Sequence, residues 1–215
     1  MMLRVISLRE TPQRLQACWD HFASLGMTLD VFYGVNAAKW GLLTKNAYEV
    51  DHPGTGFHIP QKHVGLHLSH YFMWRESLLH PFNVHGCVED DCRFVGDLKE
   101  GQTLPLLLAD YREWIDLQGT TPTMIFLGSC NCSYKPSVLV DERLHLYKVE
   151  WPQCTHAYLF NKAAAALLIE TQEKSWAPID LALIFNSFPV FKERGGQVLT
   201  VLPRLFDQGS QQIHP

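Results

Sequence analysis

The sequence contains the stretch Val84-His85-Gly86-Cys87-Val88-Glu89-Asp90-Asp91, in which small and apolar residues give way to three consecutive acids. The apolar pattern resumes at once in Cys92-Arg93-Phe94-Val95. Such a run is typical of a buried strand in an α/β protein, where ligands bind beyond the carboxyl ends of the strands. Adjacent carboxylates repel one another, and hard cations such as Mg²⁺ or Mn²⁺ prefer carboxylate oxygens and bridge to phosphates. The stretch therefore predicts a metal and nucleotide-diphosphate site; the alternative is an acidic turn that binds nothing.

Hydrophobic periodicity on either side of this stretch predicts alternating strands and helices. Residues 3–35 read as strand, helix, strand, with Thr11 capping the helix and Gly26 ending it, which favours a mostly parallel sheet. Further strands are expected at 84–89, 123–128, 145–149, 156–160 and 197–202, and further helices at 60–79, at 104–117, after Asn161 and from 178. We therefore expect an α/β fold with a mixed, mostly parallel sheet flanked by helices, in a single domain over 1–215 with a polar tail at 208–215.

Bulk composition restricts the classes of partner. The 215 residues are 47% hydrophobic and 19% charged, with a net charge of −4, which gives no electrostatic case for nucleic acid or for an anionic membrane surface. The N-terminus does not read as a signal peptide, and no apolar run approaches the roughly 18 residues of a membrane helix. We expect a cytoplasmic protein with at most peripheral membrane association. Without a secretory signal, the six cysteines read as reduced thiols, and Cys130-x-Cys132 is only a weak zinc signal.

Seven short motifs, in matching order along the chain, resemble those of glycosyltransferase family 25, which includes bacterial lipopolysaccharide galactosyltransferases and collagen galactosyltransferases. They are Val5-Ile6-Ser7-Leu8 with Pro12-x-Arg14, Leu25-Gly26 through Phe32-Tyr33-Gly34-Val35-Asn36-Ala37, the helix Val64 to Trp74 with its Ser69-His70 pair, Cys87-Val88-Glu89-Asp90-Asp91, Ile125-Phe126-Leu127-Gly128, Ala157-Tyr158-Leu159-Phe160 and Pro178-Ile179-Asp180. The chain departs from the family at Gly65-Leu66 and at Asn161-Lys162-Ala163-Ala164.

The resemblance implies a GT-A type fold, a Rossmann-like sheet that binds a UDP-sugar through Mn²⁺ or Mg²⁺. It implies inverting transfer of a hexose, galactose or glucose, to a glycan or protein hydroxyl. On this basis Asp91 is the first metal ligand, with Glu89 and, if the tail folds back, His214 as further ligands. The expected contacts to the donor nucleotide are Ser7, Leu8, Arg14, Ser69, His70, Glu89 and Asp90.

Inverting transfer needs a base that takes the proton of the acceptor hydroxyl, and a carboxylate is the usual one. Asp180 is the candidate, because Pro178-Ile179 places it at a helix start; its alternative role is a helix cap. His63, His67 and His70 fall on one face of the helix predicted at 60–79 and could bind zinc or copper. The interpretation we prefer is a polar helix flank with only His70 at the site. The apolar residues expected to face inward from this helix are Val64, Leu68, Tyr71, Phe72 and Leu79.

Two other classes of function compete with the transferase. One is a non-catalytic module that binds a nucleotide sugar or a glycan. The other is a metal-dependent phosphohydrolase that would use the same carboxylates together with the histidine face of the helix.

Overall fold

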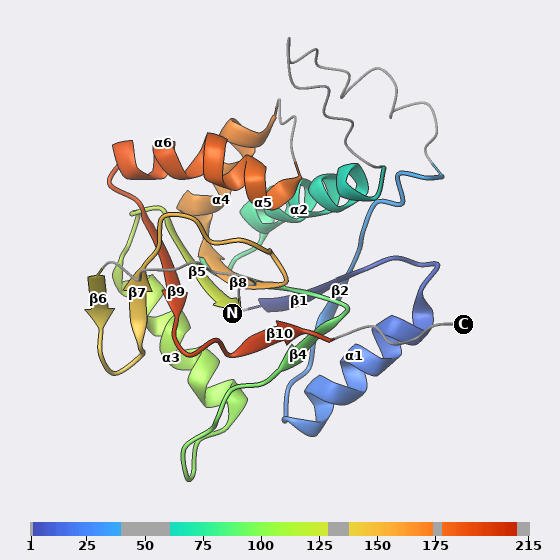
Figure 1. Cartoon of the computed structure of the whole chain (residues 1–215), viewed down its shortest axis with the longest axis horizontal. Helices are drawn as coiled ribbons and strands as arrows, with labels where there is room; N and C mark the ends of the chain where they lie inside the picture. Colours follow the sequence, from blue (N-terminus) through green and yellow to red (C-terminus); the bar gives the residue numbers. More distant parts are fainter. Residues whose placement is uncertain (1, 40–60, 129–137, 174–177, 210–215) are drawn as a thin grey trace.

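The structure, a computed structural model, describes residues 2–39, 61–128, 138–173 and 178–209 (Figure 1). Strands and helices alternate along the chain, as predicted. The strands are β1 (Met2–Ser7), β2 (Asp30–Tyr33), β3 (Val84–Glu89), β4 (Cys92–Phe94), β5 (Thr123–Gly128), β6 (Val138–Asp141), β7 (Leu146–Lys148), β8 (Ala157–Asn161), β9 (Gln197–Val201) and β10 (Phe206–Gln208). The helices are α1 (Pro12–Ser24), α2 (Gln61–Leu79), α3 (Leu104–Leu117), α4 (Lys162–Gln172), α5 (Ile179–Ala182), the π-helix η1 (Leu183–Ser187) and α6 (Phe188–Glu193).

Eight of the strands form one mixed sheet in the order β2-β1-β3-β8-β5-β9-β7-β6. Strand β1 runs parallel to both β2 and β3, and β5 runs parallel to β9. Strand β8 lies antiparallel between β3 and β5, and β7 is antiparallel to β9. Strand 84–89, which the sequence indicated as a buried strand, therefore lies inside the sheet, and β8 is the strand that separates β3 from β5.

Helices cover both faces of the sheet in a three-layer arrangement, with α1 and α3 on one side and α2, α4, α5 and α6 on the other (Figure 1). Alternate residues of each buried strand enter two separate cores, as the two-residue period of a strand requires. Val5 and Val88 pack towards α1 and α3, whereas Ile6 and Cys87 pack towards α2 and α4. A two-stranded ribbon of β4 and β10 closes the first core. The α/β fold class and the flanking helices are thus as predicted.

The inner face of α2 differs from the prediction. Val64 is buried, but Phe72 is 37% exposed and Leu79 is 86% exposed. Trp74 fills the core in their place, and the buried face of the helix is unexpectedly polar. Its buried polar members are His67, Ser69, His70 and Ser77. Hydrophobic periodicity fails here because these polar side chains lie on the buried face of the helix.

Other elements were not foreseen or differ in detail. The short strands β4, β6 and β10, and the continuation of α5 through η1 and α6, lack the long periodic pattern on which the prediction depended. Thr11 precedes α1 as predicted but makes no capping hydrogen bond with its side chain. Asn161 does cap α4, since its side-chain oxygen accepts a 2.8 Å hydrogen bond from the amide of Ala164.

The cysteines only partly follow the prediction. Cys18, Cys87 and Cys92 are free and buried, as expected for reduced thiols, but Cys154 is disulfide-bonded, so the prediction was wrong for that residue. The Cys130-x-Cys132 pair lies outside the described residues. No helix in the part of the chain that the structure describes has the length and apolar character needed to cross a membrane.

Candidate functional site

The acidic stretch ends β3 beside the end of β1, because the two strands are parallel and finish at the same edge of the sheet. Glu89 is the last residue of β3, and Asp90 and Asp91 form the turn into β4. The amide of Asp90 donates to the carbonyl of Ile6 (3.2 Å), and the hydroxyl of Ser7 donates to Asp90 Oδ2 (2.7 Å). Only Glu89 of the three acids is therefore part of the strand.

Asp90 has the most side-chain contacts of the three acids. Its side chain is only 8% exposed, and it forms an ion pair with Arg14 of α1 in addition to the bond from Ser7. The hydroxyl of Thr11 donates to the carbonyl of Leu8 (3.1 Å) and lies 3.4 Å from Asp90 Oδ2. With these donors around it, Asp90 fixes the acidic turn against the start of α1.

Asp91 is less engaged. Nη2 of Arg14 lies 3.2 Å from Asp91 Oδ2, whereas Asp91 Oδ1 is buried and has no hydrogen-bond partner in the described structure. Burial and the negative charge of Glu89 raise the pKa of Asp91 to about 6, against the opposing effect of Arg14. A buried carboxylate oxygen without a donor is costly, and a cation or a donor from a ligand would remove that cost.

Glu89 points to the other side of the acidic turn. Its Oε1 accepts a 2.9 Å hydrogen bond from Thr155 and lies 3.5 Å from Nε2 of His70 on α2. Burial alone would raise the pKa of Glu89, but the contacts with His70 and Thr155 and the proximity of His156 together lower it. Glu89 is therefore an ionised carboxylate, and Thr155 and His70 hold its side chain in place.

A cavity of about 480 Å³ opens onto these acids. It lies between the ends of β1 and β3, the start of α1, the segment after β2 and the first turns of α2. Its lining residues are Ile6, Ser7, Leu8, Thr11, Arg14, Val35, Asn36, Ala37, Ala38, Lys62, His63, Gly65, Leu66, Ser69, Glu89, Asp90 and Asp91.

Two glycines let α2 approach the segment after β2 to form one wall of this cavity. A Cβ on Gly65 would lie 2.5 Å from the carbonyl oxygen of Val35, and one on Gly34 would lie 2.7 Å from Oγ of Ser69. Ser69 then joins the two segments, since its hydroxyl donates to the carbonyl of Gly65 (2.6 Å) and accepts from the amide of Val35 (2.8 Å). The Ser69 of the predicted motif therefore shapes the wall of the cavity.

The structure brings together most of the residues predicted for the site. Seven of them line the cavity: Ser7, Leu8, Arg14, Ser69, Glu89, Asp90 and Asp91. His70 is fully buried behind Glu89 and does not line it. Asp180 lies in the first turn of α5, which packs against α2, but it is not among the described lining residues, and its Oδ1 accepts from the amide of Leu181 (2.9 Å). His214 lies outside the described residues; the amide of Gly209 donates to the carbonyl of Asp91 (2.8 Å).

The sequence matches glycosyltransferase family 25 (LPS biosynthesis protein) over residues 2–183. The chain belongs to this family. A curated relative from Bos taurus, "Probable inactive glycosyltransferase 25 family member 3", is 26% identical over 195 residues, which cover 86% of this chain and 32% of the relative. The chain thus spans about a third of that relative's length.

Among solved structures, the chain is similar to a glycosyltransferase involved in the glycosylation of the major capsid of PBCV-1. It is 12% identical, with a TM-score of 0.47, and the match covers 96% of this chain and 92% of that chain.

The three histidines of α2 do not form the metal site considered from their spacing. His63 lines the cavity, but His67 and His70 are 2% and 0% exposed. The prediction of a polar flank with only His70 at the site was therefore wrong on two points: His67 is buried, which lowers its pKa to about 4, and His63 rather than His70 lines the cavity. Within the described ranges, no three His, Cys, Asp or Glu side chains are grouped so that they alone could hold a metal ion.

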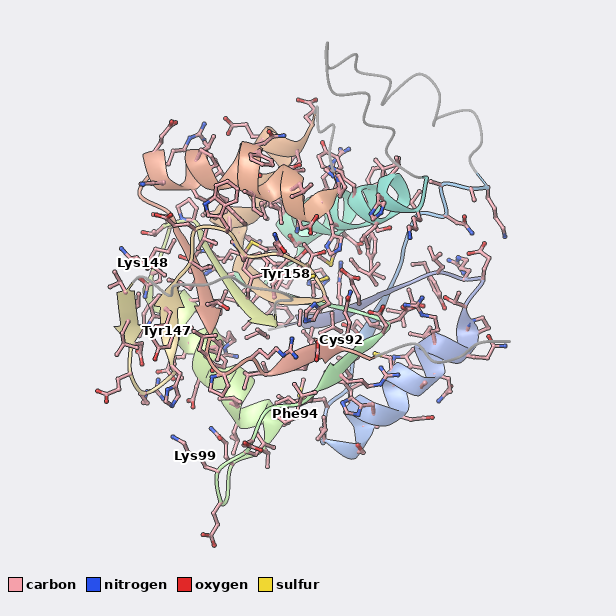
Figure 2. All side chains as sticks on the ribbon, in the orientation of Figure 1. Cys92, Phe94, Lys99, Tyr147, Lys148 and Tyr158 are labelled. Atoms are coloured by element: carbon pink, nitrogen blue, oxygen red, sulfur yellow. The ribbon has the colours of Figure 1, made fainter. Side chains whose placement is uncertain are left out.

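A second cavity, of about 450 Å³, lies elsewhere on this family 25 domain. It is lined by the start of β9, the end of β7 and parts of η1 and α6, with Trp151 at its margin. Figure 2 shows Lys148, which lines it, well to the side of Cys92, which follows the acidic turn. Because β9 begins at the edge of the sheet where β3 also begins, this cavity is remote from the acids.

Sequence reasoning missed several residues at the first cavity and behind it. Thr155, Tyr158 and Trp74 support Glu89 directly or through His70. Thr155 lies in an irregular segment with no periodic pattern, and Trp74 and Tyr158 were noted only as parts of two sequence motifs. Asn36 was noted only as part of a turn motif, yet it lines the cavity.

Proposed function

We propose that this family 25 chain is a metal-dependent glycosyltransferase that moves a hexose, galactose or glucose, from a UDP-sugar to a hydroxyl of a glycan or a protein, with inversion. The observation that carries the proposal is the arrangement of Asp91 and Arg14 at the cavity, with an unpartnered buried carboxylate oxygen beside a guanidinium. The first can accept a cation and the second can bind phosphate oxygens.

The donor nucleotide fits the first cavity in size and in polarity. A volume of about 480 Å³ is within the usual range for a small-molecule site. Ser7, Asn36 and Ser69 provide polar groups along its wall, and Arg14 and Lys62 provide positive charge for a diphosphate. The contacts of Glu89 within the described residues are made by Oε1, so Oε2 could bind a ribose hydroxyl or a metal-bound water.

The donor set also fits a divalent cation. Mg²⁺ and similar ions are usually bound by one or two carboxylates, with waters and substrate phosphates completing the coordination, so a protein cage of three or more ligands is not required. Asp91 would be the principal ligand, with Glu89 and His214 as further candidates. A bound cation there would neutralise charge on the departing diphosphate.

The chemistry then requires a base near the acceptor. The acceptor hydroxyl attacks the anomeric carbon, the bond from that carbon to the diphosphate oxygen breaks, and the hydroxyl proton passes to a carboxylate. Asp180 is our candidate for this base. It lies on α5, which packs against α2, and α2 provides one wall of the donor cavity.

A screen of nucleotide sugars tests the proposal. Purified protein with Mn²⁺ is incubated with UDP-galactose, UDP-glucose and non-uridine sugar nucleotides, and the release of free nucleoside diphosphate is measured with and without EDTA. We expect release from one UDP-hexose, abolished by EDTA. Release that is insensitive to EDTA, or release from a non-uridine donor alone, would contradict the proposal.

A non-catalytic module that binds a nucleotide sugar is the second candidate. The curated relative is named as probably inactive, and Arg14 here forms ion pairs with two of the acids. Mn²⁺-dependent binding of UDP without turnover of any UDP-sugar would favour this candidate.

A further inference from the structure

Three side chains form a buried series behind Glu89. Nε1 of Trp74 lies 3.0 Å from the hydroxyl of Tyr158, and this hydroxyl lies 2.7 Å from Nδ1 of His70. The other nitrogen of the ring, Nε2, lies 3.5 Å from Oε1 of Glu89, an ion-pair contact, and has no hydrogen-bond partner among the described residues. Trp74, Tyr158 and His70 are each 0% exposed, and Figure 2 shows Tyr158 near the middle of the molecule.

The direction of these hydrogen bonds follows from the groups themselves. An indole N–H can only donate, so the oxygen of Tyr158 accepts from Trp74. That leaves the single proton of Tyr158 for another acceptor, and Nδ1 of His70 is the near one at 2.7 Å. A neutral imidazole that accepts at Nδ1 carries its proton at Nε2. The N–H of His70 then faces the carboxylate of Glu89.

The opposite direction is less favourable. If Nδ1 of His70 donated to Tyr158, the proton of Tyr158 would be left with the sulfur of Cys87, which also contacts this hydroxyl but is a weak acceptor. A neutral ring in that tautomer would also place the lone pair of Nε2 against the carboxylate of Glu89 in a buried environment. Both consequences cost free energy, because buried polar groups need partners of the right kind.

We propose that Trp74, Tyr158 and His70 form a directed hydrogen-bond chain that holds His70 in its Nε2–H tautomer and so positions Glu89 at the donor cavity. Glu89 uses Oε1 for His70 and Thr155, and this leaves Oε2 for the ligand. Trp74, Tyr158 and His70 are positioning residues, because none of them lines the cavity. The role of Glu89 towards a ligand rests on the proposed function, whereas the tautomer of His70 does not.

The tautomer can be measured on the protein without any ligand. Long-range ¹⁵N–¹H correlation spectra of ¹⁵N-histidine-labelled protein at pH 7.5 distinguish the two neutral tautomers and the imidazolium, and the His70→Gln variant assigns the signal. We expect a protonated Nε2 and an unprotonated Nδ1 for His70. A proton on Nδ1, in either the other neutral tautomer or the imidazolium, would overturn the proposal.

Removing one hydroxyl tests the positioning role. Tyr158→Phe deletes the donor to His70, and Tyr111→Phe is its matched control: Tyr111 is 2% exposed, and its hydroxyl donates to the carbonyl of Leu144 (3.1 Å) in the other core. Tyr158→Phe loses two buried hydrogen bonds, with Trp74 and with His70, whereas Tyr111→Phe loses one, so a larger fall in melting temperature is expected for Tyr158→Phe. Only Tyr158→Phe should weaken the binding of UDP in the presence of Mn²⁺, by about tenfold or more, as is typical for an outer partner of a ligand-binding group.

The outcomes separate this proposal from the proposed function. Equal affinity for UDP in the Tyr158→Phe and Tyr111→Phe proteins would overturn the positioning role. If the unaltered protein binds no UDP with Mn²⁺, the proposed function fails. The tautomer of His70 still decides whether the hydrogen bonds from Trp74 through Tyr158 to His70 run in the direction described.

Discussion

Arg14 contacts one carboxylate oxygen of Asp91 at 3.2 Å and leaves the other, Oδ1, buried without a partner. The guanidinium also pairs with Asp90, so it partly neutralises the acidic turn. A divalent cation that binds Asp91 would compete with Arg14 for the same negative charge. Arg14 also lines the cavity, where its guanidinium can contact a diphosphate. Arg14 is therefore expected to weaken the binding of the cation and to strengthen the binding of the diphosphate.

Replacing Arg14 with Gln should separate those effects. We expect Mn²⁺ alone to bind more tightly to Arg14→Gln, because a competing cation is removed, and UDP with Mn²⁺ to bind about tenfold more weakly, the scale of one lost charge-assisted hydrogen bond. Calorimetric titrations with Mn²⁺ alone and with UDP in the presence of Mn²⁺ measure the two affinities. Arg9→Gln is the control, because Arg9 is exposed and lies over the ring of Tyr33 instead (3.9 Å). Weaker binding of both ligands by Arg14→Gln would contradict the competition.

Gly65 is predicted to set the distance between α2 and the segment after β2. Gly65→Ala would place a Cβ 2.5 Å from a backbone oxygen that cannot rotate away, so we expect a loss of stability of about 1–3 kcal/mol and weaker UDP binding. Gly119→Ala is the comparison: nothing lies within 4 Å of its Cβ, and any cost comes from its φ of +62°. Melting curves and UDP titrations of the two variants provide the test. Unchanged UDP affinity in Gly65→Ala would show that the wall is not rigid.

His67 predicts how stability depends on pH. Burial lowers its pKa to about 4, from an ordinary value near 6.5. The unfolded chain therefore binds a proton at His67 between about pH 6.5 and pH 4 while the folded chain does not, so its contribution to stability is present above pH 6.5 and is lost as the pH falls towards 4. A shift of that size corresponds to about 3 kcal/mol.

The variant His67→Gln should flatten this dependence in denaturant unfolding measured from pH 7 to pH 4. Neither ring nitrogen of His67 forms a hydrogen bond of good geometry within the described structure. The glutamine side chain of the variant is therefore not expected to break an established hydrogen-bond network. His145→Asn is the control, because His145 is exposed and Asn tolerates its φ of 51°. If the free energy of unfolding falls equally with decreasing pH in the unaltered protein and in His67→Gln, this role for His67 is excluded.

Asp180→Asn tests the proposed base. If Asp180 takes the acceptor proton, the rate of sugar transfer should fall by roughly 10² or more, with UDP and metal binding almost intact. The side chain accepts the amide of Leu181, and Asn can accept the same bond, so the stability change should not exceed about 1 kcal/mol. Transfer rate and melting temperature are measured on the same protein. Normal turnover would remove Asp180 from the mechanism.

Much of this fold could be predicted because its buried strands are continuous apolar runs between clear turn signals. Strands β3 and β5 fall at the predicted residues, and the acids at the end of β3 line the cavity. The direction of β8 could not be read, because an apolar run looks the same in either direction. The polar inner face of α2 was missed for a related reason: Tyr158, a partner of His70, lies 88 residues away in the sequence. Thr155 had no local signal at all.

Titration of UDP into the protein at pH 7.5, with Mn²⁺ and then with EDTA, tests the central claim of a metal-dependent donor site most directly. At this pH the Asp91 carboxylate is ionised, since its pKa is about 6. We predict that the unaltered protein binds UDP only with Mn²⁺, that Asp91→Asn abolishes this binding while remaining folded, and that Asp97→Asn, at an exposed aspartate beyond β4, leaves it unchanged. Equal UDP affinity with and without Mn²⁺, or full Mn²⁺-dependent affinity in Asp91→Asn, would contradict the account.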